Sequence, residues 1–362
     1  MQNLVKENHM ISGFFVFFLI YSSLVGVGAL SFQNIIFEFA ENDAWISVLL
    51  MGVSLHVIIW MIFKMLGNPA KDVIDLHRIL LGKYVGNAVS LLMVAYYFIM
   101  ALALFRSYIE IIQVWMFPTL QTWILSFLLI SIIFYIVSGG FRVLVGYCFF
   151  GVILSTLLPL FMYFNFKYGH LDNLMPIFNH SLSDFLSSFR YAGIMFMGFD
   201  TLLIYFPFIK SPEKNRKWAQ LGLFVTTCKY TILSIVTIMY YSQGLLKHTY
   251  WPTLVMIKVI EFSLIARVEF IFVSVWLLII IPTLCLSIWS CTRIMKRVTH
   301  LKPTYSLLLI LIVLFIASLL FNDRVKINWL GMHVAEICFY FIYAYIPLLF
   351  ILYLFRHKTV HN

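Results

Sequence analysis

Long apolar runs separated by short polar stretches dominate this chain of 362 residues. A helix needs about 20 mostly apolar residues to cross the hydrocarbon core of a bilayer. By that measure the sequence predicts an all-α polytopic membrane protein, with ten transmembrane helices in a single domain covering residues 1–362. The predicted spans are 11–33, 45–66, 85–110, 121–138, 143–166, 185–209, 219–243, 266–292, 304–321 and 332–355.

Three connections between spans predict short helices outside the membrane: residues 70–82, 167–184 and 244–265. In the first of these, Leu76 and Leu80 are four residues apart and therefore share one helical face. We expect this segment to lie at the cytoplasmic surface, and the other two on the outer side of the membrane.

Two predicted spans are interrupted near their middle by residues that a lipid-facing helix avoids. These are Gly26, Val27, Gly28 and Ala29 in the first span and Met197, Gly198, Phe199 and Asp200 in the sixth. A charge at bilayer depth costs at least about 2.5–3.5 kcal/mol, and broken helices are tolerated only where they line a cavity. Two such breaks, five spans apart, are typical of a substrate site in a transporter-like fold.

The ten predicted spans divide into a first repeat of about residues 11–166 and a second repeat of about residues 185–355. The two interrupted spans then occupy equivalent positions in the two repeats. This agreement predicts a 5+5 inverted repeat of the amino acid–polyamine–organocation (LeuT-like) type, in which the first and sixth helices break around the ligand.

The charge of the chain follows from its topology. Hydrophobic residues make up 62% of the sequence and charged residues only 11%, whereas a soluble domain has roughly 25% charged residues. With the N-terminus inside, sixteen of the 25 Lys and Arg residues fall on the inner side and seven on the outer side. This positive-inside bias predicts that both termini are cytoplasmic. It also accounts for most of the net charge of +10, so we expect no nucleic-acid partner.

No constellation in the sequence is typical of an enzyme. The five cysteines lie within apolar segments and lack CxxC spacing, which indicates packing rather than metal binding. Histidines are scattered over loops and ends, and neither HExxH nor GxSxG occurs. We therefore expect no catalytic activity, no cofactor and no metal centre.

The interruptions admit two interpretations each. The glycines of the first span either form an unwound turn whose N–H groups meet a polar ligand or provide a face for close helix packing. Asp200 lies about nine residues from the inner end of its span, roughly 14 Å deep. It either contacts a ligand, proton or cation, or forms a buried ion pair with Lys229 of the seventh span.

Side chains in the third and eighth spans could complete a pocket. Tyr97 and Trp276 lie near mid-depth and either cap a ligand or pack in the core. Ser274, Thr283, Ser287 and Ser290 either supply oxygens to a sodium ion beside the first break or bond back to their own helix, which is the commoner case.

Several stretches, taken in order, resemble the B subunits of the GerA-type spore germinant receptors, or endospore germination permeases. They are Val25-Gly26-Val27-Gly28-Ala29-Leu30, Ala44-Trp45-Ile46-Ser47, Gly198-Phe199-Asp200-Thr201-Leu202, Phe206-Pro207-Phe208, Trp251-Pro252-Thr253-Leu254, Arg267-Val268-Glu269 and Val275-Trp276. The resemblance runs from about residue 10 to residue 355. Where the family often has Pro after the first break and Glu after Gly-Phe, this chain has Ser31-Phe32-Gln33 and Asp200.

The resemblance implies a location in the inner membrane of a bacterial endospore. It implies a complex with a larger membrane-bound A subunit and a lipoprotein C subunit. It also implies a nutrient germinant, usually an amino acid, sugar or nucleoside, whose binding triggers germination. The preferred prediction is a sensor that binds a small polar nutrient, an amino acid first, between the first and sixth helices. An ion-coupled secondary amino acid transporter is the alternative with the same fold, and a channel scaffold without a ligand is the third hypothesis.

Overall fold

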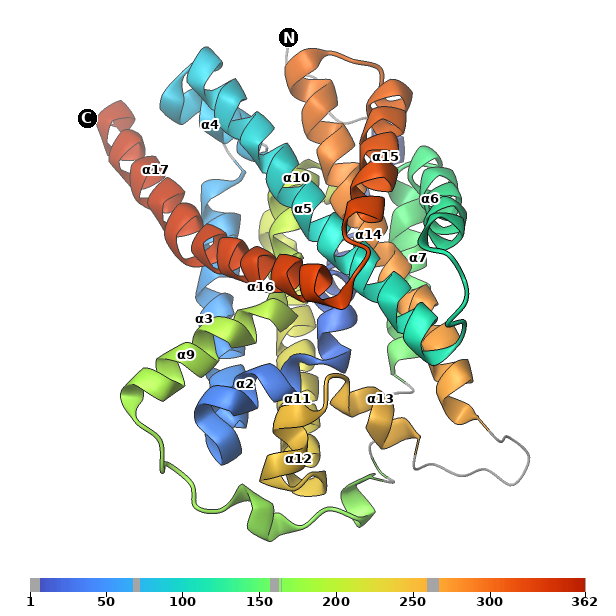
Figure 1. Ribbon diagram of the computed structural model, residues 1–362. Coiled ribbons are helices and arrows are strands. Elements are labelled where there is room, and N and C mark those ends of the chain that lie inside the picture. Colours follow the sequence, from blue (N-terminus) through green and yellow to red (C-terminus); the bar gives the residue numbers. More distant parts are fainter. Residues whose placement is uncertain (1–6, 68–71, 157–162, 164, 259–266, 362) are drawn as a thin grey trace.

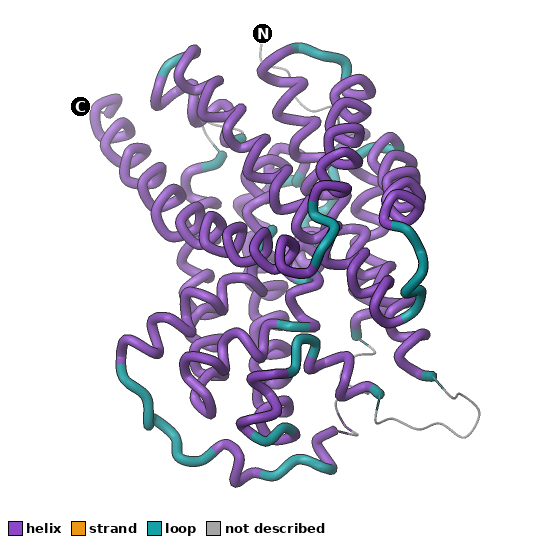
Figure 2. The backbone as a smooth tube through the Cα atoms, in the orientation of Figure 1, coloured by secondary structure: helices purple, strands orange, loops and turns teal. Residues whose placement is uncertain are grey.

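The computed structural model describes residues 7–67, 72–156, 163, 165–258 and 267–361. Helices joined by loops make up these ranges (Figure 2). Ile11 and Ile209 form an isolated parallel β-bridge that joins the entry of the first segment to the exit of the sixth.

The first half of the chain contains one interrupted segment followed by longer helices. Its elements are η1 (Glu7–His9), α1 (Phe15–Leu24), η2 (Val27–Leu30), α2 (Phe32–Ala40), η3 (Glu41–Asp43), α3 (Ala44–Met65), α4 (Val73–Leu81), α5 (Lys83–Trp115), α6 (Thr122–Ser138) and α7 (Phe141–Ser155). The predicted first span ends at residue 33, whereas the helix α2 that follows the interruption continues to Ala40. Burial of Ile36 and Phe37 holds this extra stretch in the fold.

The second half repeats the sequence of an interrupted segment and longer helices. It comprises η4 (Leu171–Leu174), α9 (Leu182–Ala192), η5 (Gly193–Phe196), η6 (Phe199–Thr201), α10 (Leu202–Tyr205), η7 (Phe206–Phe208), η8 (Pro212–Asn215), α11 (Arg216–Tyr240), α12 (Gln243–His248), α13 (Pro252–Ile257), α14 (Val268–Thr299), α15 (Pro303–Leu320), α16 (Arg324–Tyr340), the π-helical turn η9 (Phe341–Tyr345) and α17 (Ile346–His361). Residues 157–162, near the end of the predicted fifth span, lie outside the described residues.

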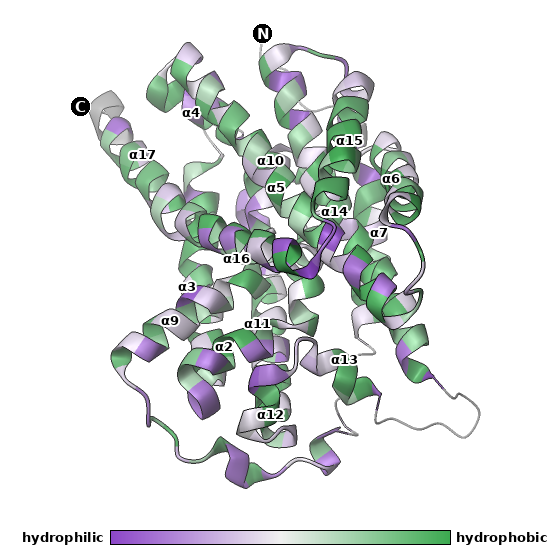
Figure 3. Cartoon of the chain, in the orientation of Figure 1, coloured by the Kyte–Doolittle hydropathy of each residue, from purple (hydrophilic) through white to green (hydrophobic). Residues whose placement is uncertain are grey.

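The protein is an integral membrane protein. Among the described residues, six helices are long and apolar enough to cross a bilayer, or eight when each of two bent pairs counts as one span. One pair is α6 with α7, bent by 119°, and the other is Leu182–Phe196 with Phe199–Phe208, bent by 54°. Apolar residues cover most of α6 and α15 in Figure 3. Phe127 and Ile312 expose more than half of their side chains there, as lipid-facing residues do.

The core forms around α14 and α11. Helix α14 packs against α5, α7 and α1, while α11 packs against α1 and α3. Both termini lie at one end of the molecule, and α12 and α13 lie at the opposite end (Figure 1). The interrupted segments are therefore enclosed by long helices rather than exposed to lipid.

The connection 70–82 forms the helix that its periodicity predicts, as α4. Asp72 caps it by accepting a hydrogen bond from the Asp75 amide at 2.9 Å. The face that carries Leu76 is buried against α5. At Gly86, a Cβ atom would lie 2.7 Å from the backbone of His77, so only glycine permits this approach of α4 to α5. The predicted helix in 167–184 is the short turn η4. The described part of the predicted helix in 244–265 contains α12 and α13, and its residues 259–265 lie outside the described residues.

A polar cluster, here called the α4 clasp, joins α4 to the end of α14. The Arg297 guanidinium lies 3.0 Å from Asp72 and 2.5 Å from Asp75. Arg78 donates to the Arg297 carbonyl at 3.0 Å and to Asn87 at 2.8 Å. Burial raises the pKa of Asp72 above its usual range, and the charge of Arg297 opposes that shift. The clasp therefore closes this end of the molecule with charges that depend on one another.

The last span changes its winding halfway. Between α16 and α17 the five residues of η9 form a π-helical turn. Tyr343 hydrogen-bonds Ser54 of α3, and Tyr345 hydrogen-bonds the His77 ring of α4. The π turn thus brings two tyrosines of one helix against two different neighbours. Such turns are frequent at functional sites.

Candidate functional site

The interruptions of the first and sixth segments pack directly against each other. Helix α1 ends at Leu24, and the chain is extended at Gly26 before η2 begins. In the sixth segment Gly198 has φ +105°, in the left-handed region that favours glycine. A Cβ atom on Gly198 would lie 2.6 Å from the Ser23 carbonyl, and one on Gly28 would lie 3.2 Å from the Ile194 carbonyl. The glycines therefore provide both the turn and the close approach.

Side chains of other helices satisfy the carbonyl groups that the end of α1 leaves free. The Thr283 hydroxyl of α14 lies 2.7 Å from the Ser22 carbonyl and 3.1 Å from the Val25 carbonyl. Tyr230 of α11 donates to the Leu24 carbonyl at 2.8 Å. Thr283 thus faces the first break, whereas Ser287 bonds back to its own helix.

A cavity of about 400 Å³ opens where the two segments meet. The predicted site residues that line it are Gly26, Val27, Gly28 and Met197, together with Thr283 and Ser287 of α14. From there it reaches Lys247 of α12, Tyr250 in the connection that follows α12, and Arg324, the first residue of α16. Its volume is within the range of small-molecule sites.

Sequence reasoning missed most of the polar lining. Ser31, between η2 and α2, and Asn34 and Glu38, both in α2, line the cavity. Their i, i+3, i+7 spacing is the signal of one helical face, and it was hidden because the span was ended at residue 33. Glu110 of α5 lines the cavity too and lies 3.8 Å from Arg324.

Asn34 carries the most informative polar atom of this lining. Its side-chain oxygen is buried and has no hydrogen-bond partner among the described residues. Leaving such an acceptor unpaired costs about 1–3 kcal/mol. A ligand that donates a hydrogen bond here would recover that energy.

The other predicted site residues lie outside the lining of this cavity: Ala29, Tyr97, Gly198, Phe199, Asp200 and Trp276. All six are buried. Tyr97 donates to the Asp200 backbone carbonyl at 2.9 Å, and Trp276 stacks on Phe272. In this conformation these six residues pack around the two interruptions and do not face the cavity.

The predicted ion pair between Asp200 and Lys229 is not formed. Lys229 donates to the Tyr21 hydroxyl at 2.7 Å and to the Ser155 carbonyl at 2.9 Å. One oxygen of Asp200 instead accepts from the Gly198 amide at 3.1 Å. Its other oxygen has no hydrogen-bond partner in the described part of the chain. The two residues lie at similar depth, but Lys229 is directed to α1 and α7, and Asp200 to its own turn.

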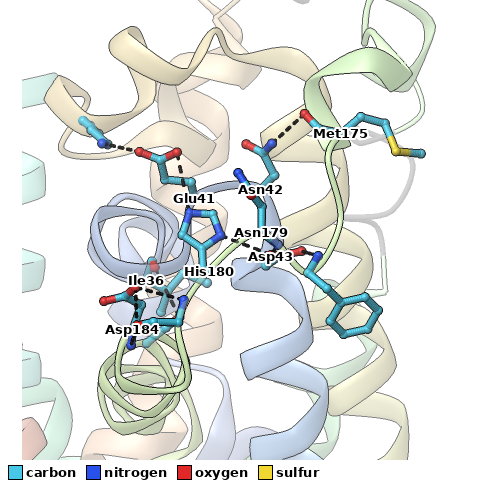
Figure 4. A network of polar contacts seen from close by, with 12 residues as sticks. Ile36, Glu41, Asn42, Asp43, Met175, Asn179, His180 and Asp184 are labelled. Carbon is cyan, nitrogen blue, oxygen red and sulfur yellow. Dashed lines mark hydrogen bonds and ion pairs between the residues drawn. The ribbon is translucent and has the colours of Figure 1, made fainter.

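A second polar network, the outer clasp, ties the connection 167–184 to the corner between α2 and α3 (Figure 4). The fully buried Asp43 carboxylate accepts from the Phe178 and Asn179 amides at 2.9 and 3.0 Å. The His180 ring lies 3.1 Å from it. Glu41, next to this corner, pairs with Lys247 at 2.7 Å, and that hydrogen bond lowers the pKa of Glu41.

Replacing Asp43 with asparagine is expected to loosen the outer clasp. Asparagine keeps the shape but has one acceptor oxygen, so a backbone amide loses a charged partner, at a cost of about 1.5–3 kcal/mol. Thermal unfolding of the detergent-solubilised protein and limited proteolysis within 167–184 measure the change. Asp172→Asn, at an exposed carboxylate of the same connection, is the matched control. Equal behaviour of the two variants would contradict the clasp.

Comparison with models of protein families shows to which family this chain belongs. The model of the family described as "Spore germination protein" matches residues 10–327. The chain belongs to this spore germination protein family. Its resemblance to the B subunits of germinant receptors is thereby confirmed.

Curated relatives of this family member extend over most of its length. Spore germination protein GerQB of Bacillus cereus is 36% identical over 348 residues, which are 96% of this chain and 97% of that protein. Spore germination protein B2 of Bacillus subtilis is 24% identical over 260 residues, or 71% of this chain and 70% of that protein.

Two solved transporters share the fold. A Na⁺-coupled sialic acid symporter, in a substrate-bound outward-open state, superimposes with a TM-score of 0.63 at 10% identity and covers 98% of this chain and 81% of its own. MhsT in complex with L-phenylalanine superimposes with a TM-score of 0.56 at 12% identity, and the match covers 95% of this chain and 97% of the MhsT chain. The predicted LeuT-like fold class is confirmed at this level, and family and neighbours are receptor subunits and transporters rather than enzymes.

Proposed function

We propose that this germination protein is a nutrient-sensing receptor subunit that binds a small polar germinant in the cavity between the first and sixth segments. The observation that carries the proposal is the meeting of both interruptions at one cavity of about 400 Å³. Binding that favours one of two conformations would shift their populations and start germination.

The charges around the cavity favour a zwitterion such as an α-amino acid. Carboxylates come from Glu38 and Glu110, and cations from Lys247 and Arg324. Lys247 and Glu110 already have partners, Glu41 and Arg324 respectively. Glu38 has no ion-pair partner among the described residues, which makes it our candidate for a ligand ammonium group.

The topology of this proposal has ten spans in a 5+5 inverted repeat, with the first and sixth helices broken. Both termini and the α4 clasp would lie in the cytoplasm, and the cavity would open to the opposite side. The bias of basic residues toward the end that holds the termini supports this orientation. The membrane would be the inner membrane of the endospore, and the partners the A and C subunits of the receptor.

Spores lacking the chromosomal copy of this chain, complemented with the chain and tested across a panel of amino acids, sugars and nucleosides, test the proposal. We expect a response to at least one nutrient class that the uncomplemented spores lack. A response that is independent of the chain for every nutrient would overturn the sensing role.

Replacing Asn34 with leucine should weaken the response to that nutrient. A lost hydrogen bond to a buried acceptor costs about 1–3 kcal/mol, and each 1.4 kcal/mol is tenfold in affinity. We expect the half-maximal germinant concentration to rise about tenfold or more, with an unchanged maximal response. Asn179→Leu makes the same change on an exposed loop residue and should leave the dose response unaltered. An unaltered response of Asn34→Leu would exclude Asn34 from the binding site.

Ion-coupled transport of an amino acid is the second candidate, because the fold is shared with a Na⁺-coupled symporter. Uptake of the radiolabelled germinant into proteoliposomes separates the two functions. Accumulation that requires a sodium or proton gradient would favour transport. Saturable binding without accumulation would favour sensing alone.

A further inference from the structure

A second concave site lies between α3 and α11, at the end of the molecule that holds both termini. It is a shallow, open depression, here called the groove, lined by His56 of α3 and by residues of η8 and the first turns of α11. The hydrogen bond from the Lys210 amide to the Ile11 carbonyl places the approach to η8 beside the N-terminal segment. The groove shares no lining residue with the nutrient cavity.

The groove has an excess of positive charge. Lys214, Arg216 and Lys217 line it, against the single carboxylate of Glu213. None of these three cations takes part in an ion pair among the described residues, although Lys217 lies 5.5 Å over the ring of Trp218. The positive N-terminal end of the 25-residue helix α11 adds to this field. An anion would find several free donors within one concave surface.

The floor of the groove is fixed by contacts between two packed helices. The His56 ring hydrogen-bonds the Gln220 side-chain oxygen, and the Gln220 amide donates to the His56 carbonyl at 3.1 Å. Both residues line the groove. A general preference for cations at the cytoplasmic face explains charge at this end, but not its collection beside the hydrogen-bonded pair of His56 and Gln220.

Apolar residues continue the wall beyond the cations. Leu221 and Phe224 line the same groove and leave 42% and 56% of their side chains exposed. They follow Arg216 by one to two turns along α11, and therefore lie deeper in the membrane. The groove thus changes from cationic to apolar along its length. An anionic amphiphile with its head at the membrane surface has the matching order, a charged head followed by an apolar tail.

We infer that this groove binds an anionic phospholipid, with its phosphate against Arg216 and Lys217 and an acyl chain along Leu221 and Phe224. Basic pockets between membrane helices bind such headgroups. A soluble phosphate ester shares the headgroup chemistry but would leave the apolar wall uncovered. The site is independent of the nutrient cavity and depends only on the membrane placement of α3 and α11.

Thermal unfolding of the purified full chain in neutral detergent, titrated with lipid, tests the inference. The additives are phosphatidylglycerol, phosphatidylcholine and the deacylated headgroup glycerophosphoglycerol. The variants are Arg216→Gln/Lys217→Gln in the groove and Lys296→Gln/Lys302→Gln, which removes two charges at the same end but outside the groove. Thermal unfolding does not require a germinant. A negative result would therefore not bear on the proposed nutrient site.

We expect phosphatidylglycerol to stabilise the wild-type chain at lower concentration than phosphatidylcholine does. The groove variant loses both basic contacts to the phosphate, so it should require at least about tenfold more phosphatidylglycerol. The control variant should follow the wild type. Equal loss in both variants, or no preference for the anionic lipid, would overturn the inference. Equal stabilisation by the deacylated headgroup would overturn the lipid in favour of a soluble phosphate ligand.

Discussion

Replacing Gly198 with alanine is expected to abolish the germination response and to lower the stability of the folded protein. Alanine at φ +105° is strained, at a cost of about 1–3 kcal/mol. The added methyl carbon would also lie 2.6 Å from the Ser23 carbonyl, which belongs to the backbone of the first segment. Because backbone cannot rotate away as a side chain can, the two interruptions would have to separate.

The response of complemented spores and thermal unfolding of the purified chain measure this effect. Gly244→Ala is the matched control, since no heavy atom lies within 4 Å of a Cβ built at that position. In α12 this change should be neutral or mildly stabilising, because glycine is a poor helix former. A Gly198→Ala variant that melts and germinates like Gly244→Ala would show that the interruptions do not need their close contact.

Removing the charge of Arg297 should produce the second large effect. In Arg297→Met, the Asp72 side chain, only 1% exposed, loses its ion-pair partner. Breaking a buried pair in this way costs about 3–5 kcal/mol. Arg293 also interacts with Asp72 electrostatically and should hold the loss near the lower value. We expect a clear fall in the melting temperature of the purified chain.

Two variants make this test specific to the α4 clasp. Lys296→Met removes a charge from the adjacent, exposed position of the same helix and should have little effect. Asp72→Asn combined with Arg297→Met removes the buried charge together with its partner and should recover part of the stability. If Arg297→Met and Lys296→Met melted alike, the clasp would have no structural role.

The elements that sequence predicted best are those with strong local signals. Helix α4 follows from its apolar periodicity, and the structure adds the capping side chain of Asp72. The positions of Gly26 and Gly198 drew attention because glycine and a nearby carboxylate are costly in a lipid-facing helix. In each case the physical reason acts within a few residues of chain, so one sequence is enough.

The polar lining was harder to predict because it depends on packing. From the sequence, Asn34 and Glu38 belong to a polar connection between two spans. In the structure they lie on the helix α2, which is held in place by the buried side chains of Ile36 and Phe37. Depth along a helix can be counted from the sequence, but direction around its axis cannot. For that reason the similar depth of Lys229 and Asp200 along their helices suggests an ion pair, although the Lys229 side chain points to Tyr21 and Ser155 instead.

The π turn in the last span has a mechanical consequence. On one side of it α16 lines the cavity of the candidate site with Asn328, and on the other Tyr345 hydrogen-bonds the His77 ring of α4. At about 1.5 Å per residue, one rod of roughly 25 Å joins the two. Because a π turn interrupts the regular hydrogen-bond ladder, it is the point at which such a rod can bend. A change in the tilt of α16 beside the cavity would therefore be passed on to α4, at the other end of the same span, through Tyr345 and His77.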